Sequence, residues 1–146
     1  MHSSTPTPGS PRDHVAAVDL GSNSFHLVIA RQGDHDLRIL DRSREPVRLA
    51  SGLGPDGEIH PEVSERAIEC LKRFGERLQG IPPERVRAVG TNTLRLAKRS
   101  RQFREAARAA LGHTIEVISG VEEARLIYLG VAHTVPARRE RRLVVD

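Results

Sequence analysis

One glycine and three polar residues form the predicted tip of a β-hairpin between Val15 and Arg31: Gly21, Ser22, Asn23 and Ser24. Glycine allows a tight turn, and successive backbone N–H groups with hydroxyl and amide side chains supply donors for an anion. Asp19, at the end of the first strand, would hold a metal-bound water rather than a phosphate, because two bare anions repel. The same residue types also occupy Asx-type turns for local reasons, so this stretch alone leaves both interpretations open.

A second polar cluster, VGTNTLR, follows an apolar segment and ends at Arg95. Donors at the start of a helix attract an anion, and a guanidinium offers a planar fork that matches phosphate oxygens. The alternative is an ordinary surface arginine. The phosphate interpretation is favoured because the carboxyl ends of parallel strands meet at one edge of a sheet.

The third cluster, ISGVEEAR, places two acids in the first turn of a predicted helix. Such acids often do no more than interact favourably with the helix dipole. Glu122 has Arg125 three residues later and can form a solvated ion pair with it. Glu123 is followed at that spacing by Leu126 and leans toward the apolar face. A carboxylate in that position suits a general base that faces a cleft.

Apolar spacing predicts a three-strand antiparallel meander followed by β-α units that add parallel strands. The expected order is β-β-β-α-β-α-β-α-β, an α/β fold with a mixed sheet that resembles the actin-like ATPase (ribonuclease-H-like) architecture. After the hairpin we expect a strand at 37–40, a loop at 45–57, a helix from 61 to near 80, a strand at 86–89, a short helix at 91–97, a helix capped by Ser100 and closing at Gly112, a strand at 115–118, a helix after 120 and a strand at 143–145.

The composition fits one domain of 146 residues with a formal net charge of +4. Residues 1–14 are predicted to be a disordered lead, since they hold no apolar segment of the kind found in signal peptides or membrane spans. The single cysteine, Cys70, excludes an intrachain disulfide and is expected to be a buried thiol in a cytoplasmic protein. Arginines cluster at 98–108 and 137–142, which suits either a polyanionic partner or two solvated faces.

Together DLGSNSFH, GTNTLR and ISGVEEAR resemble the exopolyphosphatase and guanosine-pentaphosphate phosphatase family (Ppx/GppA) over residues 15–146. The resemblance implies hydrolysis of the terminal phosphate of inorganic polyphosphate, with guanosine pentaphosphate (pppGpp) as the alternative substrate. It implies phosphate binding by the four loop residues and by Arg95, and activation of the attacking water by Glu123. It further implies Mg²⁺ or another hard divalent cation at Asp146, to which Asp19, from its place at the end of the first strand, could add a second ligand.

In that family a glycine-rich segment and a second domain follow the aspartate that corresponds to Asp146, and neither is in this chain. Residues 15–146 are therefore expected to be the N-terminal domain of a two-domain enzyme and inactive in isolation. The expected partners are polyphosphate or pppGpp and, for the full-length protein, a second copy in a homodimer; no membrane is expected. The rivals are a basic nucleic-acid-binding module, disfavoured because only four aromatic residues are present, and an actin-like sugar kinase domain.

Overall fold

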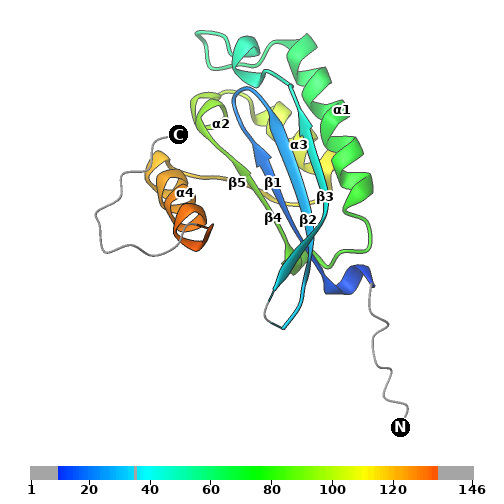
Figure 1. Cartoon of the computed structure of the whole chain (residues 1–146). Helices are drawn as coiled ribbons and strands as arrows, with labels where there is room; N and C mark the ends of the chain where they lie inside the picture. The colour runs from blue at the N-terminus through cyan, green and yellow to red at the C-terminus, as the bar shows by residue number, and fades with distance from the viewer. Residues whose placement is uncertain (1–9, 35, 135–146) are drawn as a thin grey trace.

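The computed structural model describes residues 10–34 and 36–134 (Figure 1). Its strands are β1 (His14–Leu20), β2 (Phe25–Gln32), β3 (Leu37–Glu45), β4 (Val86–Gly90) and β5 (Ile115–Val117). Its α-helices are α1 (Pro61–Arg77), α2 (Asn92–Leu96), α3 (Arg101–Leu111) and α4 (Gly120–Thr134). Short 3-10 turns are η1 (Pro11–Asp13), η2 (Leu49–Gly52) and η3 (Pro83–Arg85).

The five strands form one mixed sheet in the order β3-β2-β1-β4-β5. Strands β1, β2 and β3 are antiparallel neighbours, whereas β4 pairs with β1 and β5 pairs with β4 in parallel. The predicted meander followed by β-α units is therefore confirmed. The parallel strands β1, β4 and β5 all end at the same edge of the sheet, which is the edge that carries the three polar clusters.

Helices α1 and α3 pack side by side against one face of the sheet (Figure 1). Alternate residues of the central strands point into this layer, where Leu20, Phe25 and Leu27 are completely buried. The helices meet them with apolar stripes that include Phe74 and Phe103. Cys70 is buried in the same layer, as predicted, and its burial raises the pKa of the thiol to about 12.

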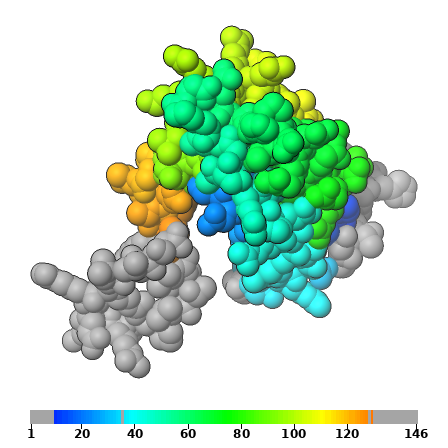
Figure 2. Space-filling model, turned by 90° about the horizontal axis from the view of Figure 1, so that it is seen from above, coloured from blue at the N-terminus to red at the C-terminus, as the bar shows by residue number. Residues whose placement is uncertain are grey.

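Helix α4 lies apart from α1 and α3, beside the opposite face of the sheet (Figure 1). Leu126 of α4 lines a hollow of about 290 Å³ together with Asp19, His26 and other residues of β1, β2 and β4. Figure 2 shows the blue atoms of the first hairpin between the orange atoms of α4 and the cyan atoms of β3. None of the helices in the described part of the chain is both long and apolar enough to span a membrane.

Some boundaries differ from the sequence-based prediction. Strand β3 extends to Glu45, five residues beyond the predicted end at 40, because the β2 ladder supplies its hydrogen bonds and its own polar residues do not reveal it. Residues 11–13 form a 3-10 turn and β1 begins at His14, so the last residues of the predicted lead have regular structure. The Arg-rich segment 137–142 and the strand at 143–145 lie outside the described residues.

Ser100 stands at the N-cap position of α3, but its side chain does not cap the helix. Its hydroxyl donates to the carbonyl oxygen of Gly57 at 3.3 Å and accepts the Ile59 N–H at 3.1 Å. The predicted cap is therefore wrong, since this buried hydroxyl instead secures the loop that precedes α1.

Candidate phosphate-binding and catalytic site

The loop between β1 and β2 is a tight turn. The Gly21 N–H donates to the Ser24 carbonyl oxygen at 3.2 Å. A Cβ atom at Gly21 would lie 2.9 Å from that same oxygen, closer than real Cβ contacts, so the turn requires glycine. Ser24 is buried, and its hydroxyl accepts a hydrogen bond at 3.3 Å from Nε of Arg44 on β3.

The segment that follows β3 anchors the back of this loop. The Arg48 N–H donates to the Asn23 carbonyl oxygen at 2.8 Å, and the Ala50 N–H donates to the Ser22 carbonyl oxygen at 3.0 Å. Arg48 has a φ of 54°, the only positive φ among the described residues other than glycine. The carbonyl oxygens of Ser22 and Asn23 are thus occupied. The backbone N–H groups of Ser22, Asn23 and Ser24, in contrast, donate no hydrogen bond to a described residue. Three donors thus remain for an anion.

The second cluster is joined to the first by a side-chain contact. Thr93 is almost completely buried, and its hydroxyl donates to the Ser22 hydroxyl at 2.8 Å. The predicted convergence of the two strand ends is therefore present in the structure. Helix α2 has only five residues, so the helix dipole contributes less to an anion site here than the sequence interpretation assumed.

Arg95 is held at this edge by contacts from Ile118, which follows β5, and from Glu123 of α4. Its Nη1 donates to the Ile118 carbonyl oxygen at 2.7 Å and to Oε2 of Glu123 at 3.1 Å. The side chain retains 26% of its accessible surface, so Arg95 is not an ordinary surface arginine. Its Nε and Nη2 donate to no described residue, which leaves part of the planar fork for a ligand.

The two acids at the start of α4 have different partners. Glu122 forms the predicted pair with Arg125, at 2.7 and 2.8 Å, and this hydrogen bonding lowers the pKa of the Glu122 carboxyl. Glu123 turns instead to Arg95. Their side chains are almost equally exposed, at 30% and 29%. The predicted Glu122–Arg125 pair is confirmed, whereas Glu123, which the sequence interpretation placed toward the apolar face of the helix, pairs with Arg95 of α2.

The proposed metal ligands are only partly within the described residues. Asp19 lies near the end of β1, between His26 of β2 and Val89 of β4, while Asp146 lies outside the described residues. Residues 10–34 and 36–134 contain no cluster of three or more His, Cys, Asp or Glu that could hold a metal ion. Since Mg²⁺ is commonly held by one or two carboxylates and substrate phosphates, Asp19 beside the loop is compatible with such an ion.

Two contacts of the site were not anticipated from the sequence. The bonds from Arg44 to Ser24 and from Arg48 to Asn23 come from the region after the third predicted strand, which the sequence marked as a plain strand end and loop. The Arg48 contact is made by a backbone N–H and has no signal in the residue type, and for the Arg44 contact the only signal was a charged side chain near the loop.

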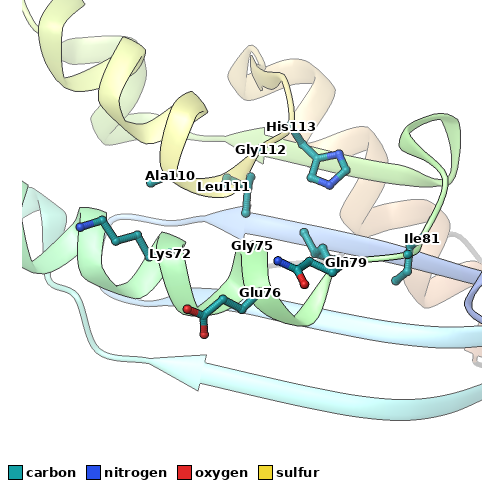
Figure 3. A pocket seen from close by; sticks show the side chains of 11 residues that line it. Lys72, Gly75, Glu76, Gln79, Ile81, Ala110, Leu111, Gly112 and His113 are labelled. Carbon is teal, nitrogen blue, oxygen red and sulfur yellow. The ribbon is translucent and has the colours of Figure 1, made fainter.

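A separate cavity of about 450 Å³ lies between the last turns of α1 and α3 (Figure 3). Lys72, Glu76, Gln79 and His113 contribute its polar side chains. It adjoins the segments that lead into β4 and β5, so it lies at the opposite edge of the sheet from the loop. None of the candidate residues lines it, and in α/β sheets ligands bind at the carboxyl ends of the strands.

Two of the five basic side chains in segment 98–108 have hydrogen-bonding partners among the described residues. Arg104 donates to the carbonyl oxygens of Leu94 and Ala97, and Arg101 pairs with Glu105. Three of the four aromatic residues are buried in the core: Phe25, Phe74 and Phe103. The burial of these rings leaves none of the three available to stack on a base, which disfavours a single-strand nucleic-acid interface.

The sequence model of the Ppx/GppA phosphatase family matches residues 28–146. The chain belongs to this family. A solved Ppx/GppA family member from Aquifex aeolicus is 31% identical, with a TM-score of 0.74, over 84% of this chain and 40% of its own. An exopolyphosphatase from Cytophaga hutchinsonii is 30% identical, with a TM-score of 0.77, over 84% of this chain and 39% of its own.

Membership of the Ppx/GppA family confirms the actin-like ATPase fold expected from the sequence. It also places the chain in a family of phosphatases. The chain spans about two fifths of the length of these solved relatives.

Proposed function

We propose that the full-length protein is a cytoplasmic, metal-dependent exopolyphosphatase that releases the terminal phosphate of inorganic polyphosphate. The observation that carries this proposal is the joining of three clusters, far apart in sequence, at one edge of the sheet. Thr93 bonds Ser22 at 2.8 Å, and Arg95 bonds Glu123 at 3.1 Å. Phosphate donors, a guanidinium fork and a carboxylate therefore lie together where ligands bind in α/β sheets.

In this proposal the loop amides and Arg95 hold the oxygens of the terminal phosphate. Glu123 accepts a proton from water as the water oxygen bonds to phosphorus, and the bridging P–O bond to the rest of the chain breaks. One carboxylate oxygen is fixed by Arg95 Nη1, which leaves the other for the water. Positioned donors of this kind stabilise the charge that develops in the transition state without reorganisation.

A divalent cation completes the proposed site, with Asp19 and Asp146 as its protein ligands. When bound, such an ion neutralises charge on the transferred phosphoryl group. Asp19 is supported by its position on β1, two residues before Gly21, where it lies opposite His26 of β2. Asp146 rests on the resemblance alone.

Polyphosphate is favoured over pppGpp because no phenylalanine ring among the described residues is exposed beside the loop to stack on a guanine base. Phe25 adjoins the loop, but it is completely buried in the core. A chain of phosphates needs only hydrogen-bond donors and positive charge, which the loop, Arg95 and the arginines of β3 provide.

We further propose that this chain is the N-terminal domain of a two-domain enzyme and is inactive by itself. The family relatives are more than twice as long as the part that this chain matches. Phosphoryl transfer depends on donors and metal around the whole phosphate. Without the second domain, which would supply one side of the site, the rate of phosphate release should be almost abolished.

The test is release of orthophosphate by the full-length protein with Mg²⁺, from polyphosphate and from pppGpp, alongside the 146-residue chain. We expect efficient release from polyphosphate by the full-length protein and almost none by the chain alone. A preference for pppGpp would reassign the substrate. Equal rates for the two proteins would show that the site is complete within these residues and that the two-domain proposal is wrong.

A further inference from the structure

The side chains of β3 divide cleanly between the two faces of the sheet. Asp41 is paired with Arg77, and Glu45 is paired with Arg73, so both acids face α1. Because side chains alternate along a strand, Arg42 must point to the opposite face, away from α1 and α3. Arg44 points to this opposite face as well, and both arginines are exposed.

The exposed face of β3 leads directly to the candidate phosphate loop. Arg44 lies opposite His26 in the antiparallel register, and His26 lies opposite Asp19 of β1. Neighbouring strands are about 4.8 Å apart, so these three side chains form one short row beneath the loop. Arg44 also contacts the loop itself, because its Nε donates to the Ser24 hydroxyl at 3.3 Å.

Positive charge predominates on this part of the face. Arg42 lies opposite Val28, one row farther from the loop than Arg44, and neither arginine forms an ion pair with a described residue. The Arg44 nitrogens Nη1 and Nη2 donate no hydrogen bond within residues 10–34 and 36–134. Beyond Arg42 the exposed side chains of β3 become apolar at Leu40 and Ile39, so the basic stretch is short.

We propose that Arg44 and Arg42 bind the non-terminal phosphates of a linear polyphosphate whose terminal phosphate occupies the loop of residues 21–24. The inference rests on the proposed function and assigns a subsite to it. Arg44 contacts the phosphate that follows the terminal one, and Arg42 contacts a phosphate farther along. The apolar end of the strand limits the subsite to a few phosphates, so affinity should rise with chain length and then level off.

Two substitutions at Arg44 separate charge from structure. Arg44→Ala removes the guanidinium and the bond to Ser24, whereas Arg44→Gln keeps a donor for Ser24 and loses the charge together with Nη1 and Nη2. Arg42→Ala removes the more distant cation. Arg108→Ala is the matched control, because it removes the same charge from an exposed position on α3, on the other side of the sheet.

The measurement is kcat and KM of the full-length protein for tripolyphosphate, for long-chain polyphosphate and for pppGpp. We expect Arg44→Ala and Arg44→Gln each to raise KM for long polyphosphate by about tenfold with little change in kcat. Arg42→Ala should raise KM for long chains but not for tripolyphosphate. Arg108→Ala should match the wild type, and added salt should reduce the differences among the variants.

A wild-type KM in Arg44→Gln would overturn the subsite, as would a fall in kcat without a change in KM, which would make Arg44 only a support for Ser24. An equal rise in KM for pppGpp and polyphosphate would show that the subsite reads phosphate charge without selecting a linear chain. Direct binding of long-chain polyphosphate, followed by calorimetry, keeps the test independent of turnover. If the wild type binds polyphosphate but does not hydrolyse it, the proposed function fails while the subsite is still judged by the binding of each variant.

Discussion

Arg95 and Glu123 form an ion pair across 28 residues of sequence, with Nη1 of the arginine 3.1 Å from Oε2 of the glutamate. The same nitrogen donates to the carbonyl oxygen of Ile118, the residue after β5, at 2.7 Å. One guanidinium therefore fixes both the strand end that leads into α4 and the carboxylate on its first turn. This arrangement explains how a residue on a five-residue helix can orient a group on another helix.

The first prediction concerns the two acids of α4. In the full-length protein, Glu123→Gln should lower kcat by about 10²- to 10⁴-fold, the usual contribution of a general base, and leave KM nearly unchanged. Glu122→Gln should lower kcat less than about threefold, since the Glu122 carboxylate pairs with Arg125 of its own helix and not with Arg95. Orthophosphate release from polyphosphate measures both. Equal losses in the two variants would remove Glu123 from its catalytic role.

The second prediction concerns Arg95, which is proposed both to bind phosphate and to orient Glu123. Arg95→Ala should raise KM by at least about tenfold, because a charged donor to phosphate is lost, and should also lower kcat, because Glu123 loses its orienting partner. Arg95→Lys should recover part of kcat but little of KM, since an ammonium lacks the planar fork. Steady-state kinetics of both variants provide the measurement. A variant that changes KM alone would show that the Arg95 to Glu123 bond does not matter for turnover.

Local patterns were sufficient to predict most of the fold. The apolar stripe that includes Cys70 and Phe74 predicted α1, and the hairpin followed from two apolar segments around a polar turn. The alternation of apolar and polar residues did not predict residues 41–45 of β3, because this part of the strand carries polar side chains on both faces. Its pairing is supplied by β2, and its acids are matched to arginines of α1.

The candidate site could be predicted in its members but not in its contacts. Residue types and the family resemblance marked the loop, Arg95 and Glu123. The bond between Thr93 and Ser22 joins residues 71 positions apart, and nothing in either motif specifies it. Glu123 was assigned to an apolar neighbourhood because helical spacing describes only its own helix, whereas its partner comes from α2.

A third prediction tests the bond that joins the first two clusters. Thr93→Val preserves the shape of the side chain but leaves the Ser22 hydroxyl without its donor, so we expect a loss of about 1 kcal/mol in the free energy of unfolding. KM for polyphosphate should rise as the loop loses its fixed position. Thr93→Ser retains the hydroxyl and is the control for activity. Urea denaturation and kinetics of the two variants check this prediction, which fails if valine and serine behave alike in KM.

The last prediction concerns Cys70, which is completely buried between α1 and the sheet. Burial, followed by the nearby charge of Glu45, raises the pKa of the thiol to about 12, so the reactive thiolate is scarce at neutral pH. We expect the native protein to resist a disulfide reagent at pH 8 and to react fully once unfolded in urea.

Because the native pKa of Cys70 exceeds the unfolded value of about 9, the unfolded state loses its proton first as pH rises. The contribution of this thiol to stability is therefore complete below about pH 9 and declines between about pH 9 and 12. Cys70→Ala should remove that part of the alkaline decline while it lowers stability at neutral pH through the cavity that it leaves. Rapid labelling of the native protein would show that the thiol is accessible, and identical alkaline unfolding of the wild type and Cys70→Ala would show that its ionisation is not coupled to folding.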